Sequence, residues 1–458
     1  MNALEIRAAI SLAFVYVMRM LGLFMVIPVI AVAAVKFPDY SPLWVGVAIG
    51  GYGLTQAILQ IPMGMASDKV GRKPVIYFGL CVFIVGSLIA AYADSMLMLT
   101  LGRILQGMGA IAGAVMALAA DVTRESQRTK IMAIIGISIG FSFYLALLLG
   151  PFVSASFGLQ GIFFVTAVGA SLCLPMIKWG VKTSNTYAPT GDSLPNRAAL
   201  REMFKHPQLW RFNLSVLLIH LLITSFFVQV PRLLATADFE LSEHWKIYTP
   251  ILILSIVLMV VLMRLSDALS RKRVFMISLG LMAFAFILLV NMTNQVLSVD
   301  WTWIVIAGIL FFAGFNYMEA NLPAMVSSIA PAGQKGTAMG LYASFQFFGA
   351  FAGGVLTGAL IQWVSTLAVY LFCLLVIVAL GLIINSVKAV DKTARFALEL
   401  NECDKRNMAK VFEYESALRQ VEGVVEVNVS EADSAIYVKA AFKKVSLDQL
   451  YTAIGRKI

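Results

Sequence analysis

The sequence has little charge and is rich in apolar residues. Asp, Glu, Lys and Arg make up 13% of the 458 residues, whereas hydrophobic residues make up 60%. Ordinary soluble domains carry roughly a quarter charged residues, so this composition argues against a soluble globular protein. Because each crossing of a bilayer needs about 20 apolar residues, we expect most of the chain to span a membrane.

Paired cysteines and cofactor motifs are also lacking. The four cysteines show no paired spacing and three lie in apolar segments, which predicts neither disulfides nor a metal site. The sequence has no Gly-rich phosphate loop and no hydrolase or redox motif. We therefore expect no cofactor and no enzymatic activity, and any transport would draw its energy from an ion gradient.

The basic excess is confined to the first part of the chain. Residues 1–390 hold 24 Lys/Arg and 14 Asp/Glu, a net charge of +10, whereas residues 391–458 hold 11 of each. The positive-inside rule explains such an excess in the loops of a membrane protein without a nucleic-acid partner. Basic loops near 69–73, 124–130 and 271–273 alternate with loops that lack Lys and Arg, which predicts that both termini are cytoplasmic.

The apolar segments predict an all-α membrane fold of twelve spanning helices. They lie near residues 8–35, 44–66, 74–93, 97–121, 131–156, 160–181, 208–236, 246–266, 274–293, 301–329, 336–363 and 367–388. Polar residues 182–206 separate two six-helix halves, 1–181 and 207–390. Within this linker, basic residues recur every fourth position from 197 to 205, so an interfacial helix and an unstructured loop are both open.

Residues 391–458 have a different character and predict a small α+β domain that is ferredoxin-like. The expected order is strand, helix, strand, strand and helix, at 396–400, 408–420, 424–429, 435–439 and 446–455. The loop after the first strand has one cysteine, Cys403, and no Cys-x-x-Cys pair, so we do not expect metal transfer. Self-association, binding of a regulatory ligand and other regulation stay open for this domain.

A short cluster of charged and small residues separates the second and third apolar segments. It contains Gly64, Asp68, Gly71, Arg72 and Lys73. Asp68 could accept hydrogen bonds from the N-terminus of a facing helix, where the backbone N–H groups and the dipole favour an anion. Arg72 and Lys73 would lie among anionic lipid headgroups. We expect this loop to control conformational change, although topology alone could explain the basic pair.

This spacing resembles the signature loop between helices 2 and 3 of the major facilitator superfamily. The same acid-to-base spacing recurs in the second half, from Asp267 to Arg271 and Lys272, as expected for two related halves. The resemblance implies a small-molecule transporter of the bacterial inner membrane. It also implies that Asp121, at the end of the fourth predicted helix, pairs with Arg72.

Two further motifs resemble the drug:proton antiporter branch of this superfamily. One is Arg103-x-x-Gln106-Gly in the fourth helix, and the other is Gly150-Pro151 in the fifth, although Ser154 and Ala155 replace the glycines that should follow. The resemblance implies a proton-linked structural role for Arg103. It also implies that an acid belongs in the first helix, where this chain has arginine.

Ionisable residues inside the predicted helices are candidates for function, because charge is costly in a bilayer. We expect Glu319 to carry protons, with Asn316 one turn away to bind substrate or orient the acid. A structural acid held by Arg19 or His220, and a substrate-binding acid, are alternatives. His220 could shuttle protons or be a satisfied core histidine. Arg19 could hold an anionic substrate or neutralise Glu319.

Residues expected to line a substrate cavity are Arg19, Asn316, Gln106, Tyr144 and Phe345, although aromatic side chains could equally serve helix packing. The glycines at 349, 353, 354 and 358 predict a close helix approach. The whole pattern predicts proton-coupled efflux of small molecules by alternating access. The alternatives are an uncoupled facilitator or importer of the same fold, and a membrane sensor that acts through the C-terminal domain.

Overall fold

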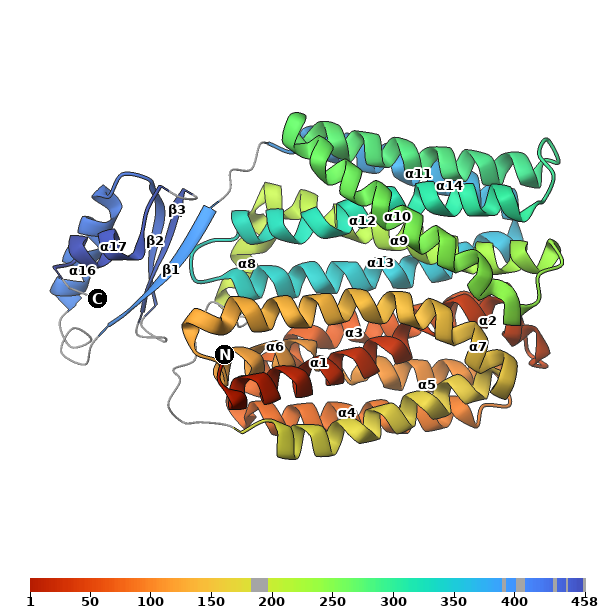
Figure 1. Ribbon diagram of the computed structural model, residues 1–458, viewed down its shortest axis with the longest axis horizontal. Helices are drawn as coiled ribbons and strands as arrows, with labels where there is room; N and C mark the ends of the chain where they lie inside the picture. Colours follow the sequence, from red (N-terminus) through yellow and green to blue (C-terminus); the bar gives the residue numbers. More distant parts are fainter. Residues whose placement is uncertain (183–196, 389–392, 401–407, 431–434, 442–443, 456–458) are drawn as a thin grey trace.

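The structure is a computed structural model of the chain (Figure 1). It describes residues 1–182, 197–388, 393–400, 408–430, 435–441 and 444–455. The first helices are α1 (Ala3–Phe24), α2 (Ile27–Ala33), η1 (Ala34–Lys36), α3 (Pro42–Val70), α4 (Arg72–Ala91), α5 (Met96–Met108), α6 (Ala112–Asp121) and α7 (Glu125–Gly180). After the linker helix α8 (Arg197–Lys205) come α9 (Pro207–Thr236), η3 (Leu241–Glu243), α10 (His244–Ala268), α11 (Arg271–Thr293), α12 (Trp301–Ile329), α13 (Lys335–Trp363) and α14 (Thr366–Ser386).

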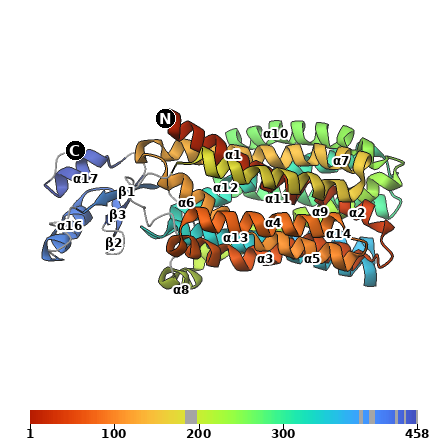
Figure 2. The ribbon, with the colours of Figure 1, turned by 90° about the horizontal axis from the view of Figure 1, so that it is seen from below.

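The long helices lie side by side, and the N-terminus and the C-terminal sheet lie at the same end of the bundle (Figures 1 and 2). This end is called the terminal side below, and the opposite end is the far side. Eleven helical stretches among the described residues are long and apolar enough to cross a membrane. The described part therefore forms a helical membrane fold with a small sheet attached.

Two of the predicted helices, 131–156 and 160–181, lie on either side of a kink within α7. Its 51-residue apolar stretch would measure about 77 Å as a straight helix at 1.5 Å per residue, more than twice the roughly 30 Å of a hydrocarbon core. Gly158 interrupts α7 with φ 71°, a left-handed conformation that glycine adopts without steric cost. Figure 1 shows α7, coloured from orange to yellow, reaching the far side and turning back.

Two other predicted helices are divided locally. The first breaks between α1 and α2, where Pro28 lies in the first turn of α2 and lacks the N–H that a continuous helix would use. The fourth breaks between α5 and α6 around Gly109, where the helical backbone ends. Both breaks fall inside candidate spans, Ala3–Lys36 and Met96–Asp121, so they change the shape of a span and not its extent.

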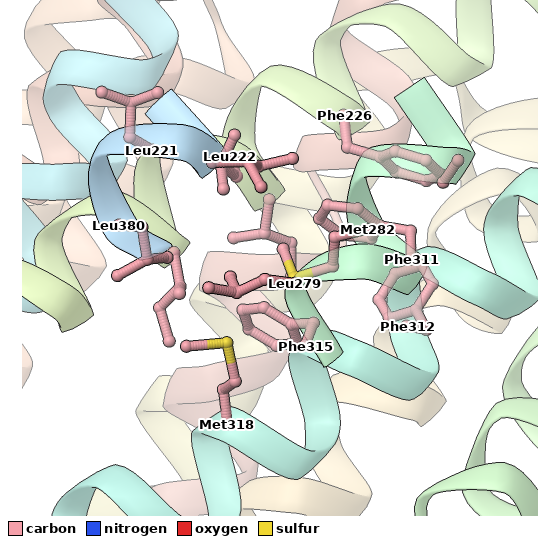
Figure 3. Close-up of a cluster of buried hydrophobic side chains, with 14 of the residues drawn as sticks. Leu221, Leu222, Phe226, Leu279, Met282, Phe311, Phe312, Phe315, Met318 and Leu380 are labelled. Carbon is pink, nitrogen blue, oxygen red and sulfur yellow. The ribbon is translucent and has the colours of Figure 1, made fainter. Parts of the chain in front are cut away.

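The second half is held together by an aromatic and aliphatic core between α9, α11, α12 and α14 (Figure 3). Phe226 of α9 stacks on Phe311 of α12, with ring centroids 4.3 Å apart and planes 8° apart. Leu279 and Met282 of α11 fill the space beside these rings. Inside a bilayer such helices gain little from the hydrophobic effect, and close packing of this kind stabilises their association.

The linker and the C-terminal domain follow the predicted element order. Helix α8 is present, whereas residues 183–196 lie outside the described residues, as do residues 389–392. The boundaries of the predicted domains therefore stay predictions. The C-terminal elements are β1 (Thr393–Glu399), α16 (Met408–Gln420), β2 (Val424–Ser430), β3 (Ala435–Ala441) and α17 (Leu447–Ala453).

These strands form a three-stranded antiparallel sheet of order β1-β3-β2. The central strand β3 pairs on both sides, so Val438 lies opposite Phe396 of β1 and Val427 of β2. The first strand begins three residues earlier than predicted. The ferredoxin-like assignment stays a prediction.

Candidate functional site

The two halves meet along a seam of small residues between α3 and α13. A Cβ atom on Gly46 would lie 2.0 Å from the carbonyl oxygen of Gly354, and one on Gly53 would lie 2.7 Å from that of Phe347. Figure 2 shows the two helices side by side. Because α3 begins and α13 ends on the far side, the contact between Gly46 and Gly354 joins the two halves toward that side of the bundle.

The predicted glycine run at 349–358 makes these close approaches, which confirms that prediction. Gly354 and Gly358 face α3, and a Cβ on Gly358 would lie 2.4 Å from the carbonyl oxygen of Pro42. Gly349 and Gly353 instead face α9, with Leu217 and Leu221 as neighbours. Helix α13 is therefore packed on both sides by backbone, which only glycine permits at these positions.

Aromatic rings also join the halves near the middle of the bundle. Phe143 of α7 contacts Phe24 of α1, with ring centroids 5.0 Å apart, and Phe227 and Phe312 of the second half at 6.0 and 6.1 Å. Next to it, Asn316 of α12 donates a hydrogen bond to the hydroxyl of Tyr144, at 3.1 Å. Tyr144 and Asn316, both predicted to line a cavity, are thus brought together across the two halves.

Glu319 lies in a polar group with two side chains from neighbouring helices. Gln346 of α13 donates to Glu319 Oε1 at 3.2 Å, and its amide nitrogen lies 2.8 Å from Nε2 of His220 in α9. His220 Nδ1 lies 3.1 Å from the carbonyl oxygen of Val216, which can only accept. The imidazole is therefore best described as neutral, with its proton on Nδ1 and Nε2 accepting from Gln346.

The carboxylate of Glu319 is only partly satisfied in this group. Its Oε2 atom is buried, has no hydrogen-bond partner among the described residues, and lies 3.9 Å from Nε2 of His220. Glu319 therefore lies beside His220, whereas Arg19 donates to Gln56 and Tyr52. Sequence reasoning missed Gln346, although a lone amide in the apolar run around Phe345 could have indicated it.

Phe345, the remaining aromatic cavity candidate, contacts a ring near the linker. Its ring lies 5.1 Å from that of Trp210 in α9, and Trp210 in turn contacts Phe204 of α8, at 6.1 Å. These contacts join α13 to the linker helix. A substrate contact for Phe345 stays a prediction.

Arg19 is deeply buried in the first half and has more donors than partners. Its side chain is 3% exposed, and Nη2 donates to the side chains of Gln56 and, at 3.5 Å, Tyr52. Gln56 donates onward to Gln60, at 2.7 Å. The Nε and Nη1 atoms of Arg19 are buried without a hydrogen-bond partner among the described residues. Three of its five N–H groups are therefore unused.

Arg103 has more of its donors satisfied by the protein than Arg19, because its Nε and Nη1 atoms both donate, whereas its Nη2 atom is buried without a hydrogen-bond partner among the described residues. It donates to Gln106 at 2.9 Å and to the carbonyl oxygens of Ala48 and Gly22 at 3.4 and 3.5 Å, and it lies over the ring of Tyr52. Gln106 is 0% exposed. In this structure the amide of Gln106 is used inside the first half, and a cavity role for Gln106 stays a prediction.

The 64–73 loop forms an ion-pair network at the terminal side. Arg72 Nε lies 3.0 Å from a carboxylate oxygen of Asp121, the pair that the family resemblance implied. Asp68 pairs with the same guanidinium and not, as predicted, with the N-terminus of a facing helix. Lys73 donates to the carbonyl oxygen of Val181 at 2.6 Å, and Gly71 links α3 to α4 with φ 103°. The loop thus ties together the terminal ends of α3, α4, α6 and α7.

The remaining predicted glycines allow close packing within the first half. A Cβ on Gly150, which precedes Pro151 in α7, would lie 2.5 Å from the carbonyl oxygen of Met25 at the break between α1 and α2. Gly64 of α3 lies close to Gly113 of α6. The Gly150-Pro151 signature thus lies where α7 crosses the bend of the first span.

The C-terminal sheet contacts the loop between α12 and α13. Lys439 of β3 is 8% exposed, and its Nζ donates to the carbonyl oxygens of Ile329 and Ala330 at 3.2 and 3.3 Å. A cation at these last carbonyls complements the negative end of the α12 dipole. The ring of Tyr437 packs on Gly333, where φ is 76° and a Cβ would lie 2.7 Å from Tyr437 Cδ2.

Known proteins share both the sequence pattern and this architecture. The profile of the Major Facilitator Superfamily matches residues 12–261 and 244–395. The chain is 37% identical over 452 residues to the inner membrane transport protein YajR of Escherichia coli (strain K12), covering 98% of this chain and 97% of that protein. It is 31% identical over 144 residues to multidrug resistance protein D of the same organism, covering 31% of this chain and 36% of that protein.

A solved structure supports the fold at low identity. The D-xylose-proton symporter superposes with a TM-score of 0.67 at 15% identity, over 83% of this chain and 98% of that one. The family match and the superposition thus point to the same family that the charged loop at 64–73 resembles. The chain belongs to the major facilitator superfamily and is a multi-pass membrane transporter.

Proposed function

We propose that this transporter exports small molecules in exchange for protons by alternating access. The observation that carries this proposal is the Glu319–Gln346–His220 group, in which a partly satisfied carboxylate lies inside the bundle beside a neutral imidazole. A carboxyl in a membrane interior can be charged only at a cost, so it takes up a proton when no cation faces it. The partial similarity to multidrug resistance protein D supports the outward direction.

The proposed topology has twelve crossings, with α7 counted as two helices that meet at Gly158. The terminal side then faces the cytoplasm of a bacterial cell, because it carries the basic loops at 69–73 and 271–273. The closed seam between α3 and α13 would lie toward the periplasm. The structure then corresponds to an inward-open state, in which Glu319 exchanges protons with the cytoplasm.

The 64–73 loop would stabilise the opposite state. In the present state Asp68 is held by Arg72, and α13 begins at Lys335 on the same side of the bundle. When the terminal side closes, the first turn of α13 would offer N–H groups to Asp68, as first expected from the sequence. Arg72 would keep Asp121 as its partner in both states.

Proteoliposomes test the proposed exchange. Purified protein is reconstituted around a pH-sensitive dye, and benzoate, benzamide, hexanoate, hexanamide and a matched set of amines are added in turn. Substrate-driven proton movement supports exchange. Labelled substrate that crosses without proton movement would instead make the protein an uncoupled facilitator. If no compound crosses the membrane and a partner binds to the C-terminal domain, the result would favour a membrane sensor.

We propose further that the substrate carries a negative charge, which Arg19 binds. Burying an arginine with three unused N–H groups is costly unless an acceptor reaches it in part of the cycle. Its neighbour Tyr52 adjoins Gly53, which contacts Phe347 of the opposite half, so Arg19 lies next to the seam. In this fold, substrates bind between the halves near the middle of the membrane.

Arg19→Gln should therefore weaken the binding of acids but not of their amides. The loss should be roughly 10- to 100-fold, since a hydrogen bond to a charged group contributes about 1.5–3 kcal/mol. The measurement is the melting temperature of the purified protein against the concentration of benzoate and benzamide. Arg264→Gln, which removes an exposed charge on α10, is the matched control. Equal binding of acid and amide to the wild type would contradict an anionic substrate.

We also propose that the C-terminal domain regulates transport through the α12–α13 loop. Helix α12 carries Glu319 and α13 carries Gln346, so the sheet contacts the connection between the two helices that hold the proposed proton site. Docking of the domain would restrain the relative motion of these helices. Self-association and binding of a regulatory ligand are further ways to change this contact.

Lys439→Met should loosen the docked domain. The side chain loses two hydrogen bonds and its interaction with the helix dipole, about 1–2 kcal/mol together. The backbone amides of residues 330 and 332–334 should then exchange hydrogen about 5- to 30-fold faster. Lys444→Met, at an exposed position of the same domain, serves as control. Unchanged exchange in Lys439→Met would show that this contact does not hold the domain in place.

A further inference from the structure

A cavity lies at the terminal side of the second half, and Glu319, Gln346 and His220 are not among its lining residues. Its volume is about 430 Å³, within the range of small-ligand pockets. Three of its lining residues, Arg271, Lys272 and Lys388, are basic, and none is acidic. The cavity therefore has the charge to hold an anion.

The internal repeat shows why these cations are available. In the first half, Arg72 is neutralised by Asp68 in its own loop and by Asp121 at the end of α6. Arg271 occupies the repeat position of Arg72 and follows Asp267 at the same spacing, yet neither residue forms an ion pair among the described residues. The helix that corresponds to α6 in the second half is α12, and residues 326–330 at its terminal end include no acid.

The backbone around the cavity favours an anion as well. Ser270 caps α11, and its Oγ accepts from the backbone N–H of Arg273 at 3.4 Å. The cavity is lined by Ser270, Arg271 and Lys272, so it lies at the N-terminus of a 23-residue helix, where the dipole attracts negative charge. Lys272 also donates to the carbonyl oxygen of Asn385, which holds its ammonium group beside the end of α14.

The other walls of the cavity are apolar. Phe212 of α9, Phe275 of α11, Met325 of α12 and Ile384 of α14 line it, and all four are buried. A phosphate ion alone would leave these walls unused, whereas a phospholipid has both an anionic headgroup and apolar chains. Basic pockets between helices at the cytoplasmic side of membrane proteins bind such headgroups.

We propose that this cavity binds the phosphate group of an anionic phospholipid, with its acyl chains along the apolar wall. Arg271, Lys272 and Lys388 hold the phosphate group, and the N-terminus of α11 adds its dipole. The lipid then takes the place that Asp121 has in the first half and neutralises the repeat arginine. A bound lipid would link the terminal ends of α9, α11, α12 and α14.

The test uses the full-length protein, purified in detergent and stripped of lipid. Its melting temperature is followed against dioctanoyl phosphatidylglycerol, dioctanoyl phosphatidylcholine and glycerol 3-phosphate. Phosphatidylglycerol should protect at lower concentration than the zwitterionic lipid. Arg271→Gln and Lys388→Gln should each raise the half-saturating concentration about fivefold, because a basic residue near an anionic headgroup contributes about 1 kcal/mol.

Arg273→Gln is the matched control, because Arg273 is exposed in the same turn but does not line the cavity. Lys388 lies beyond the end of α14. Lys388→Gln therefore changes the cavity without changing the residues at the N-terminus of α11. If Arg273→Gln raised the half-saturating concentration of phosphatidylglycerol as much as the cavity variants do, the effect would be one of general surface charge and the proposal would be overturned. Protection by glycerol 3-phosphate at the concentration of the lipid would make the ligand a soluble phosphate and overturn the lipid assignment. Neither result depends on whether transport is coupled to protons.

Discussion

Glu319→Gln should reduce substrate-driven proton movement to the level of empty liposomes, while exchange of labelled substrate continues. The amide has nearly the shape of the carboxyl group and can still accept from Gln346, whose nitrogen lies 3.2 Å from Glu319 Oε1. It cannot bind or release a proton at any accessible pH. If the carboxyl group is the proton carrier, coupling is lost and the packing of α12 and α13 is kept.

Glu243→Gln is the matched control for this experiment. Glu243 lies on the far side in an exposed ion pair with Lys246, at 2.7 Å, and exposed pairs contribute little to stability. This variant should move protons like the wild type. Proton movement that survives in Glu319→Gln would transfer the coupling role to His220 or Arg103. His220→Gln separates these two, because it removes the imidazole that faces Glu319 and leaves Arg103 untouched.

The arrangement of the helices could be predicted well because apolar length and loop charge are local properties. The break predicted between residues 156 and 160 falls where the structure has the non-helical Gly158. The strand order β1-β3-β2, in contrast, is not a local property. Alternation in 424–429 and 435–439 indicates strands, but which strand occupies the centre depends on pairing over long distances.

The candidate site shows the same limit. The sequence identifies Glu319, His220 and Arg19 as buried ionisable residues, because charge is rare and costly in apolar helices. It does not say that Glu319 meets His220 through Gln346, since these residues belong to three different helices. Gln106 was predicted to line a cavity, and in this structure Arg103 and Ser87 use its amide. Polarity identifies residues that need a partner, and only the fold says whether the partner is protein or substrate.

Gly46→Leu should disfavour closure of the far side and lower the transport rate about tenfold. A Cβ at this position would lie 2.0 Å from the carbonyl oxygen of Gly354, a backbone atom that cannot move without shifting α13. Helices α3 and α13 would have to separate along the seam, and overpacking of this kind costs about 1–3 kcal/mol. If the two halves alternate, that cost falls on the inward-open state alone, and the outward-open state becomes the more populated one.

Labelling of an engineered cysteine measures this shift. Leu43→Cys places a thiol at the far end of the seam, where the backbone N–H of Leu43 donates to Gln362 Oε1 at 3.2 Å. Its reaction with a membrane-impermeant maleimide should become about tenfold faster in Gly46→Leu, as expected when about 1.4 kcal/mol is shifted between two states. Gly280→Leu is the matched control, because a Cβ there meets nothing within 4 Å. If both leucine variants label and transport alike, the seam is not the closing surface, and the far side must close elsewhere, with the aromatic contacts around Phe143 as the remaining candidate.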